Sequence, residues 1–363
     1  MALKDIIGQE KAINILLGTL SRNRIPSSYL FAGESGIGKK FTAVNFAKTL
    51  NCQQSQLSAI SHQPSDCCDG CPSCKKIDSQ THPDFMMVTP EKSEIRVEEI
   101  RTIEEALSFA PYEGKRKVVI VDEAEAMNAS AANAFLKTLE EPPPQSIIML
   151  ISSSPDRLPE TIRSRCSRVN FSPLSPEKCE EVIKIAQKHG SADSSFAVLR
   201  RMEAQKKENF QPPGLPDFQA SELLSTVSRL SMGRPGLAIS NDLIEERDWF
   251  IRLFKGMVHG ENKETWGDKE EIEKWFNYAI TLLRDTAVFK ITGQENMLIN
   301  IDLKDSIAGM SKTIELKDII ESYIKLTFLK GYLRFNLNKA ITWNYTGFIL
   351  RKFTGFASPR ASR

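Results

Sequence analysis

Two patterns of apolar and polar positions alternate along the first half of the chain. Short apolar runs bounded by turn residues predict buried strands, whereas apolar residues spaced by three and four predict helices. The strands are expected at 29–32, 85–88, 117–121, 147–151 and 168–171. The helices are expected at about 9–24, 41–50, 97–109 and 129–139. This alternation predicts an α/β fold, in which a parallel sheet carries helices on both faces.

The pattern becomes helical after Pro173 and stays so almost to the end of the chain. A helix start is expected at Ser175-Pro176-Glu177, since proline fits the first turn of a helix. A polar, proline-rich stretch at about 203–219 predicts a loop insertion, and a second break lies at 240–241. We therefore expect an α/β domain at 1–174, a small helical lid at 175–241, an all-α C-terminal domain at 242–353 and a frayed tail at 354–363.

Composition and charge mainly exclude classes of protein. The chain has 363 residues, with 48 Lys and Arg against 46 Asp and Glu, which gives a formal net charge of +2. This balance argues against a protein held on DNA by overall positive charge. The apolar runs fall short of the roughly 20 residues of a membrane span, and the charged N-terminus does not resemble a signal peptide. We expect a cytoplasmic protein with no membrane partner.

Four of the seven cysteines crowd together, at Cys67, Cys68, Cys71 and Cys74. In a cytoplasmic protein such spacing indicates metal binding rather than disulfides, and four thiolates suit a closed, structural Zn²⁺ site. We expect Cys68, Cys71 and Cys74 as ligands within a zinc module at about 52–74. The fourth ligand is Cys52 or Cys67, and Cys52 is preferred because adjacent cysteines seldom bind one ion. A reduced, metal-free loop is the alternative.

A phosphate-binding pattern, G-x4-G-K, runs from Gly33 to Lys39 between an expected strand and an expected helix. Gly33, Gly36 and Gly38 allow backbone N–H groups to converge on phosphate oxygens, and Lys39 reaches the terminal phosphates. The pattern requires Ser or Thr next, as a Mg²⁺ ligand, but this chain has Lys40. We therefore expect a degenerate nucleotide site that does not act as an ATPase by itself. Whether ATP or ADP binds there is left open by the sequence.

Two carboxylates follow the third expected strand, at Asp122 and Glu123. Beside a phosphate loop, an aspartate in this place holds Mg²⁺ and the adjacent glutamate orients the attacking water. The alternative is that both acids simply begin the next helix, whose N-terminus favours negative charge.

A series of motifs in fixed order resembles the clamp-loader subunits of bacterial DNA polymerase III, which are AAA+ proteins with a RecA-like P-loop domain. The resemblance covers about residues 5–175 and thins beyond them. The motifs are Ile7-Gly8-Gln9, the phosphate loop, the cysteine cluster with His82-Pro83-Asp84, Asp122-Glu123-Ala124, the segment 136–142 and Thr161-Ile162-Arg163-Ser164-Arg165-Cys166.

Within this family the chain resembles the delta-prime type more than the tau/gamma motor. The motor needs Ser or Thr at position 40 and a sensor arginine at position 236, where this chain has Lys40 and Gly236. The segments 282–285 and 336–338 are weakly similar to the helical collar of delta-prime. An active tau/gamma-type ATPase is the alternative within the family. A stand-alone zinc-ribbon protein that binds nucleic acid is the alternative from another class, but basic and aromatic residues are scarce around the cysteines.

The resemblance implies membership of a five-part ring that loads the sliding clamp on primed DNA, with tau/gamma motor subunits and the delta subunit as partners. Arg165 would be an arginine finger that contacts ATP bound to a neighbouring motor subunit. The alternative for Arg165 is an ordinary surface arginine, and Arg163 and Arg168 lie nearby. Ser153, or Ser152, matches the first sensor position. The DNA polymerase activity would be that of the whole complex.

Overall fold

The computed structural model describes residues 2–54, 66–91, 94–188, 220–259, 266–335 and 337–354. The loop insertion expected at 203–219, the tail beyond residue 354 and Asn336 lie outside these residues. The chain divides into two compact units, one of residues 1–185 with 233–237 and one of 186–232 with 238–363. The further division of the helical part into a lid and a collar stays a prediction. No described helix is long and apolar enough to cross a membrane.

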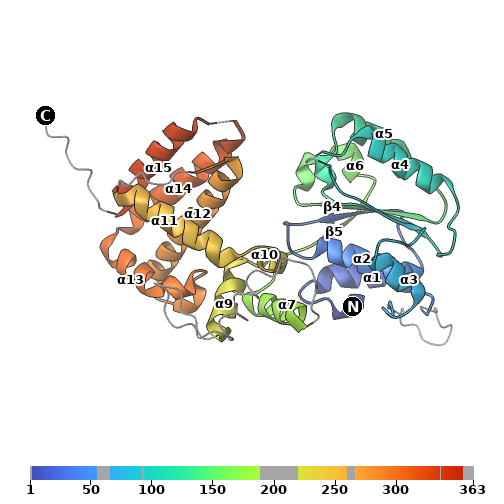
Figure 1. Ribbon diagram of the computed structural model, residues 1–363, viewed down its shortest axis with the longest axis horizontal. Coiled ribbons are helices and arrows are strands. Elements are labelled where there is room, and N and C mark those ends of the chain that lie inside the picture. Colours follow the sequence, from blue (N-terminus) through green and yellow to red (C-terminus); the bar gives the residue numbers. More distant parts are fainter. Residues whose placement is uncertain are drawn as a thin grey trace. The chain divides into compact units, whose positions relative to one another are not determined.

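A parallel five-stranded sheet forms the centre of the first unit (Figure 1). The strand order is β2-β3-β4-β1-β5, so the strand before the phosphate loop lies between β4 and β5. Because the strands are parallel, their C-terminal ends share one edge, and β1 pairs with β4 up to Ala32↔Ser152. The strands are β1 (Ser28–Ala32), β2 (Phe85–Val88), β3 (Lys117–Val121), β4 (Ser146–Ser152) and β5 (Ser167–Asn170).

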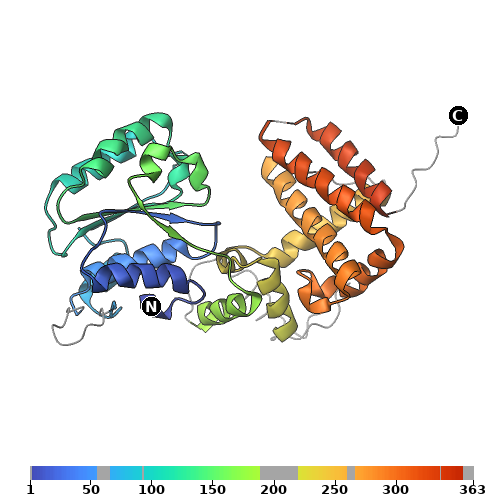
Figure 2. The same ribbon diagram turned by 180° about the vertical axis from the view of Figure 1, so that it is seen from behind.

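Helices cover both faces of this sheet, as Figures 1 and 2 show from opposite sides. Alternate residues of a strand face opposite ways, so Tyr29 and Phe31 pack with α1 and α2, whereas Leu30 and Ala32 pack with α4 and α5. The α/β fold class predicted from the sequence is confirmed. The helices of this unit are α1 (Glu10–Ser21), α2 (Lys39–Asn51), α3 (Pro72–Asp78), α4 (Val97–Ser108), α5 (Ala129–Glu140), α6 (Glu160–Arg163) and α7 (Pro176–Lys188, whose last residues belong to the second unit), with one-turn 3-10 helices η1 (Leu3–Asp5), η2 (Ala124–Ala126) and η3 (Pro155–Arg157).

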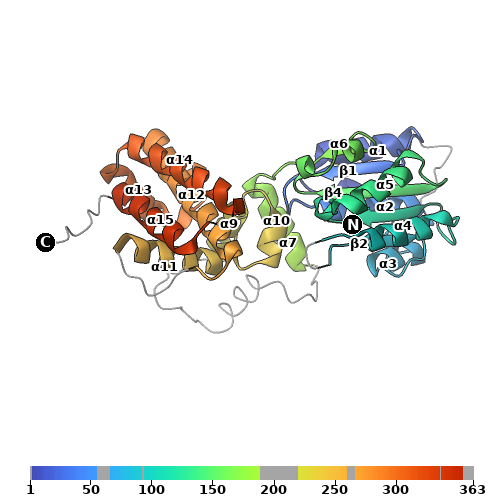
Figure 3. The ribbon, with the colours of Figure 1, turned by 90° about the horizontal axis from the view of Figure 1, so that it is seen from above.

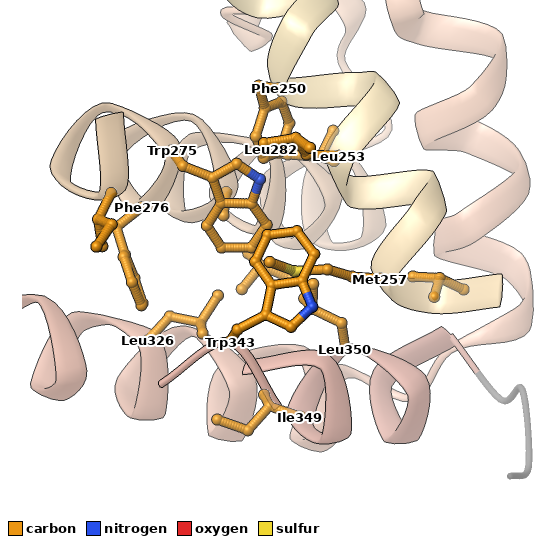
Figure 4. Packing of buried hydrophobic residues seen from close by; sticks show 14 of the residues in the cluster. Phe250, Leu253, Met257, Trp275, Phe276, Leu282, Leu326, Trp343, Ile349 and Leu350 are labelled. Carbon is orange, nitrogen blue, oxygen red and sulfur yellow. The ribbon is translucent and has the colours of Figure 1, made fainter. Parts of the chain in front are cut away.

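The described part of the second unit is helical, as predicted, and Figure 3 shows its helices from above. Its core is built on tryptophans: the rings of Trp266 and Trp343 lie 4.8 Å apart, and those of Trp266 and Trp275 lie 5.4 Å apart. Figure 4 shows Trp275 and Trp343 among the apolar side chains of the surrounding helices. The helices are α9 (Ala220–Leu230), α10 (Pro235–Ser240, whose first turn belongs to the first unit), α11 (Leu243–His259), α12 (Lys269–Thr292), α13 (Lys304–Thr313), α14 (Leu316–Tyr332) and α15 (Lys339–Thr354), with η4 (Glu295–Met297), η5 (Ile301–Leu303) and η6 (Leu333–Phe335).

Candidate functional site

The phosphate loop turns sharply between β1 and α2. Gly33, Gly36 and Gly38 have φ angles of 154°, 80° and 96°, in the region that glycine adopts without strain. Lys39 is buried, and its Nζ donates hydrogen bonds to the carbonyl oxygens of Gly33 and Glu34, each at 2.6 Å. Burial lowers the pKa of Lys39 despite the nearby carboxylates. The lysine predicted to bind phosphate therefore lies against the carbonyl groups of its own loop.

Lys40 forms an ion pair with the carboxylate that was predicted to hold a metal. Its Nζ lies 3.2 Å from Asp122 Oδ2. In P-loop ATPases these two positions carry a hydroxyl and a carboxylate that hold Mg²⁺ between them. The ammonium group of Lys40 thus places a positive charge beside Asp122, where the charge of the ion would otherwise act. Half of the Lys40 side chain is exposed, so the pair adds at most about 1 kcal/mol to stability.

A carboxylate that the sequence analysis did not identify reaches the predicted sensor residue. Glu125 Oε1 accepts hydrogen bonds from Ser153 Oγ at 2.5 Å and from Ser153 N at 2.9 Å. Burial raises the pKa of Glu125, but these hydrogen bonds outweigh burial and the pKa falls below its usual range. Glu123 is exposed and has a left-handed backbone, with φ of 49°. Glu125 lies two residues after Glu123 in the same acidic run, and the turn of η2 brings it to the end of β4.

Residues 233–237 pack directly on the phosphate loop. Gly236 N donates a hydrogen bond to Gly36 O at 2.8 Å, and the Arg234 guanidinium lies 3.6 Å from the Glu34 carboxylate. A Cβ atom at position 236 would lie only 2.8 Å from Gly36 O. An arginine at position 236, which the motor subunits would carry, therefore cannot be placed here unless the loop moves.

Gln9 fastens the other side of the loop. Its Nε2 donates hydrogen bonds to Ile37 O at 3.2 Å and to Ser172 O at 2.8 Å. Its Oε1 accepts a hydrogen bond from Ser172 N at 3.2 Å. The Ile7-Gly8-Gln9 motif thus joins the phosphate loop to the segment that leaves β5.

The structure brings the sulfur atoms of Cys52, Cys68, Cys71 and Cys74 within 4.8 Å of one another. The Cys52–Cys71 sulfur distance of 4.0 Å is close to the edge of about 3.8 Å in a tetrahedron with zinc–sulfur bonds of about 2.3 Å. Backbone N–H groups point at Cys68 Sγ (3.3 Å) and Cys71 Sγ (3.5 Å). Burial acts to raise the pKa of Cys71, but hydrogen bonds lower it to about 6. This donor set fits a tetrahedral zinc ion.

Cys67 lies outside this group and close to two carboxylates. Burial, together with the charges of Asp69 and Asp66, raises the pKa of the Cys67 thiol to about 12. Its sulfur atom is not among the four that lie within 4.8 Å of one another, so Cys67 is not a member of the close group.

Buried polar contacts tie the cysteine cluster to the sheet domain. Lys48, on α2, pairs with Asp69 at 2.6 Å and with Asp78 at 3.0 Å. His82 Nε2 lies 3.1 Å from the Ser73 hydroxyl. The Asp84 carboxylate accepts hydrogen bonds from the backbone N–H groups of Tyr112, Glu113 and Gly114. The His82-Pro83-Asp84 motif, whose role the sequence did not reveal, thus supports the cysteine module structurally.

Arg165 lies on the surface after the short helix α6, with 34% of its side chain exposed. Its Nη1 donates to Thr161 O at 2.7 Å, and its Nη2 lies 2.5 Å from Glu140 Oε1. The neighbouring arginines have other local partners: Arg163 pairs with Asp156 at 3.2 Å, and Arg168 Nε donates to Asn170 at 2.8 Å.

Comparison with known proteins supports the resemblance over the first half of the chain. Residues 8–175 match the family model described as DNA polymerase III, delta subunit. The delta' subunits of Bacillus subtilis and Pseudomonas aeruginosa are 34% and 38% identical over 173 and 166 residues, which are 48% and 45% of this chain and 50% and 48% of the relatives. The tau subunit of Bacillus subtilis is 37% identical over 175 residues, 48% of this chain and 30% of that protein.

A solved gamma-subunit-related protein of DNA polymerase III from Thermotoga maritima aligns with 20% identity and a TM-score of 0.45, over 93% of this chain and 99% of that one. The sequence matches to the delta' relatives span about half the length of those proteins. Over residues 8–175, the resemblance to the delta-prime type of bacterial DNA polymerase III subunit is therefore confirmed.

Proposed function

We propose that the chain is a delta-prime-type subunit of a DNA polymerase III clamp loader, which completes the ring and acts through its neighbours. The observation that carries this proposal is the Lys40–Asp122 ion pair, which joins the two positions that a motor subunit would use for Mg²⁺. Tau/gamma motor subunits and the delta subunit are the proposed partners. The complex would load the sliding clamp on primed DNA in the cytoplasm.

Two further contacts support a subunit that is not itself a motor. The Ser153 hydroxyl, which would detect a γ-phosphate, is bonded to Glu125. Gly36 O is bonded to Gly236 N, at the position where the motor carries a sensor arginine. Bound Mg·ATP would have to compete with internal contacts at each of these positions. A role as an ATPase in its own right is therefore disfavoured.

Arg165 is the proposed contribution of this chain to ATP hydrolysis. At a subunit interface, its guanidinium would contact the phosphates of ATP held by a neighbouring motor. A planar, permanently charged group stabilises the negative charge that spreads over the phosphoryl oxygens in the transition state. A finger supplied in this way raises turnover by roughly a thousandfold or more.

Zinc is the proposed ligand of Cys52, Cys68, Cys71 and Cys74. Four thiolates close the coordination shell, so the ion would serve the structure rather than chemistry. It would fasten the end of α2 to α3, in the region that Lys48 and Asp84 already tie to the sheet domain.

Residues 242–353 are the proposed collar, and within it helices α14 and α15 carry the proposed surface that meets other subunits. Exposed apolar side chains recur along both helices at helical spacing, and contiguous patches of this kind mark interaction surfaces. These side chains are Ile320, Ile324, Phe328 and Tyr332 on α14, and Ile341, Tyr345 and Phe348 on α15.

The ATPase of a clamp loader reconstituted with variants of this chain tests the proposal. Arg165→Ala should lower turnover by roughly a thousandfold at each site that receives this finger, while ring assembly survives. Lys39→Ala should change turnover less than about twofold, because Lys39 is not part of a working motor site. A collapse with Lys39→Ala would instead show a tau/gamma-type motor, and unchanged turnover with Arg165→Ala would refute the finger.

A further inference from the structure

Arg165 is held by a carboxylate whose position helix stability does not explain. Glu140 is the last residue of α5, and its Oε1 lies 2.5 Å from Arg165 Nη2. The C-terminus of a helix carries partial negative charge, so an acidic residue there is disfavoured. The next residue, Glu141, adds a second acid at the same helix end.

The backbone around Arg165 is anchored on the core. Ile162 is fully buried, and its carbonyl oxygen accepts a hydrogen bond from Arg165 N at 3.1 Å. Cys166, on the other side, packs against the same apolar cluster as Ile162. The direction in which the Arg165 side chain leaves the backbone is therefore fixed, and only its own torsion angles remain to be set.

Two acceptors from different elements set the orientation of the guanidinium. The Thr161 carbonyl, in α6, takes a hydrogen bond from Nη1, and the Glu140 carboxylate, at the end of α5, pairs with Nη2. A guanidinium carries five N–H donors, so these two contacts, together with a longer one from Nη1 to Ser164 Oγ at 3.5 Å, leave others for a group outside the chain. A charged group that is already oriented loses less conformational entropy when it meets its target.

We propose that Glu140 is a positioning residue for Arg165, which holds the guanidinium in the direction needed to meet ATP on the neighbouring subunit. This inference rests on the proposed role of Arg165 as a finger in trans. Glu140 does not touch the nucleotide. Because 48% of its side chain is exposed, its contact with Arg165 is open to solvent, and we expect the loss of Glu140 to cost less than the loss of Arg165.

The test measures the ATPase of a loader reconstituted with the full chain. Glu140→Ala should lower kcat by about 3- to 10-fold, with KM for ATP within about twofold of the wild type, because positioning acts on the transition state. Glu140→Gln keeps an acceptor oxygen, so its kcat should fall less than that of Glu140→Ala. Glu141→Ala is the matched control, since it removes an equal charge one residue away and should leave kcat unchanged.

A double variant separates this inference from the proposed function. In an Arg165→Ala background, Glu140→Ala should have no further effect, because it acts only through the arginine. If Arg165→Ala lowers kcat but Glu140→Ala matches Glu141→Ala, the positioning role is overturned and the finger stands. An increase in kcat with Glu140→Ala, or a loss that adds to that of Arg165→Ala, also overturns the inference. If Arg165→Ala itself has no effect, both the finger and its positioning residue are refuted.

Discussion

Lys40 Nζ lies 3.2 Å from Asp122 Oδ2, so the lysine that follows the phosphate loop neutralises the carboxylate predicted to hold a metal. The pair is internal to the chain and independent of nucleotide. The nearby ammonium group of Lys40 therefore balances the charge of the Asp122 carboxylate from within the chain.

Lys40→Thr should restore Mg²⁺-dependent nucleotide binding. The variant supplies a hydroxyl ligand and releases Asp122 from its ion pair, so ADP should bind about tenfold more tightly with Mg²⁺ than without it, a difference of roughly 1.4 kcal/mol. Titration of a fluorescent ADP analogue with and without Mg²⁺ measures this ratio. Lys40→Met removes the charge without adding a ligand, so this variant should bind ADP equally well with and without Mg²⁺. Strong Mg²⁺ dependence in the wild type would contradict the prediction.

Gly236→Ala should destabilise the first unit. Its Cβ would lie 2.8 Å from Gly36 O and 3.0 Å from Gly36 Cα, and these are backbone atoms that cannot rotate away. We expect a loss of about 1–3 kcal/mol in the free energy of unfolding, measured by urea denaturation. Gly18→Ala is the control: a Cβ at position 18 in α1 meets nothing within 4 Å, so this variant should be neutral or more stable. If the two variants are equally stable, the phosphate loop accommodates the added methyl group with no loss in the free energy of unfolding.

The purified chain should carry about one equivalent of zinc. Denaturation followed by titration of the released metal measures it, and less than about half an equivalent per chain would reject the site. Cys52→Ser should lose the metal, because its sulfur belongs to the close group of four. Cys67→Ser is the matched control and should retain it. The opposite outcome would make Cys67 the fourth ligand.

The Asp84 carboxylate should make the stability of the chain sensitive to acid. Burial acts to raise its pKa, but three backbone hydrogen bonds outweigh burial, so the folded pKa lies below the ordinary value of 3.8. A group with a depressed folded pKa contributes stability above its unfolded pKa and loses it as the pH falls through the folded one. Asp84→Asn should therefore cost about 1–3 kcal/mol at pH 7 and make unfolding less dependent on pH below about 4.

The control for this pH dependence is Asp156→Asn, because that side chain is 91% exposed. Its unfolding free energy should follow the wild-type pH profile within about 0.5 kcal/mol. If Asp84→Asn follows that same profile, the three hydrogen bonds to Asp84 contribute nothing to acid sensitivity.

The local pattern of the sequence predicts much of the fold because strands and helices depend on neighbours in the chain. The apolar runs before Gly33 and Asp122 mark β1 and β3, and the cysteine spacing indicates three members of the group of four. Boundaries are less certain: α2 begins at Lys39 rather than at residue 41, and α3, which begins at Pro72, was not expected.

The missed contacts join residues that lie far apart in the sequence. Glu125 and Ser153 follow two different strands, β3 and β4. Strand β4 lies between Glu140 and Arg165 along the sequence, and Gly36 and Gly236 come from opposite halves of the chain. The register of the sheet and the path of the connections place these partners together, and spacing along the chain carries no signal of either. Motifs therefore identified positions in the site, whereas the contacts that alter its chemistry required the structure.

The position of Cys52 at the end of α2 makes the cysteine group sensitive to the state of the domain around it. Fifteen residues, 53–67, separate it from Cys68 along the chain, and an unfolded chain must lose entropy to bring such ends together. Cys52 lies at the end of α2, and Cys74 lies in α3, so the four sulfurs come together where these two helices pack, and Lys48 of α2 pairs with Asp69 and Asp78 in the same region. Metal binding and the packing of α2 against α3 would therefore be coupled, so that each stabilises the other.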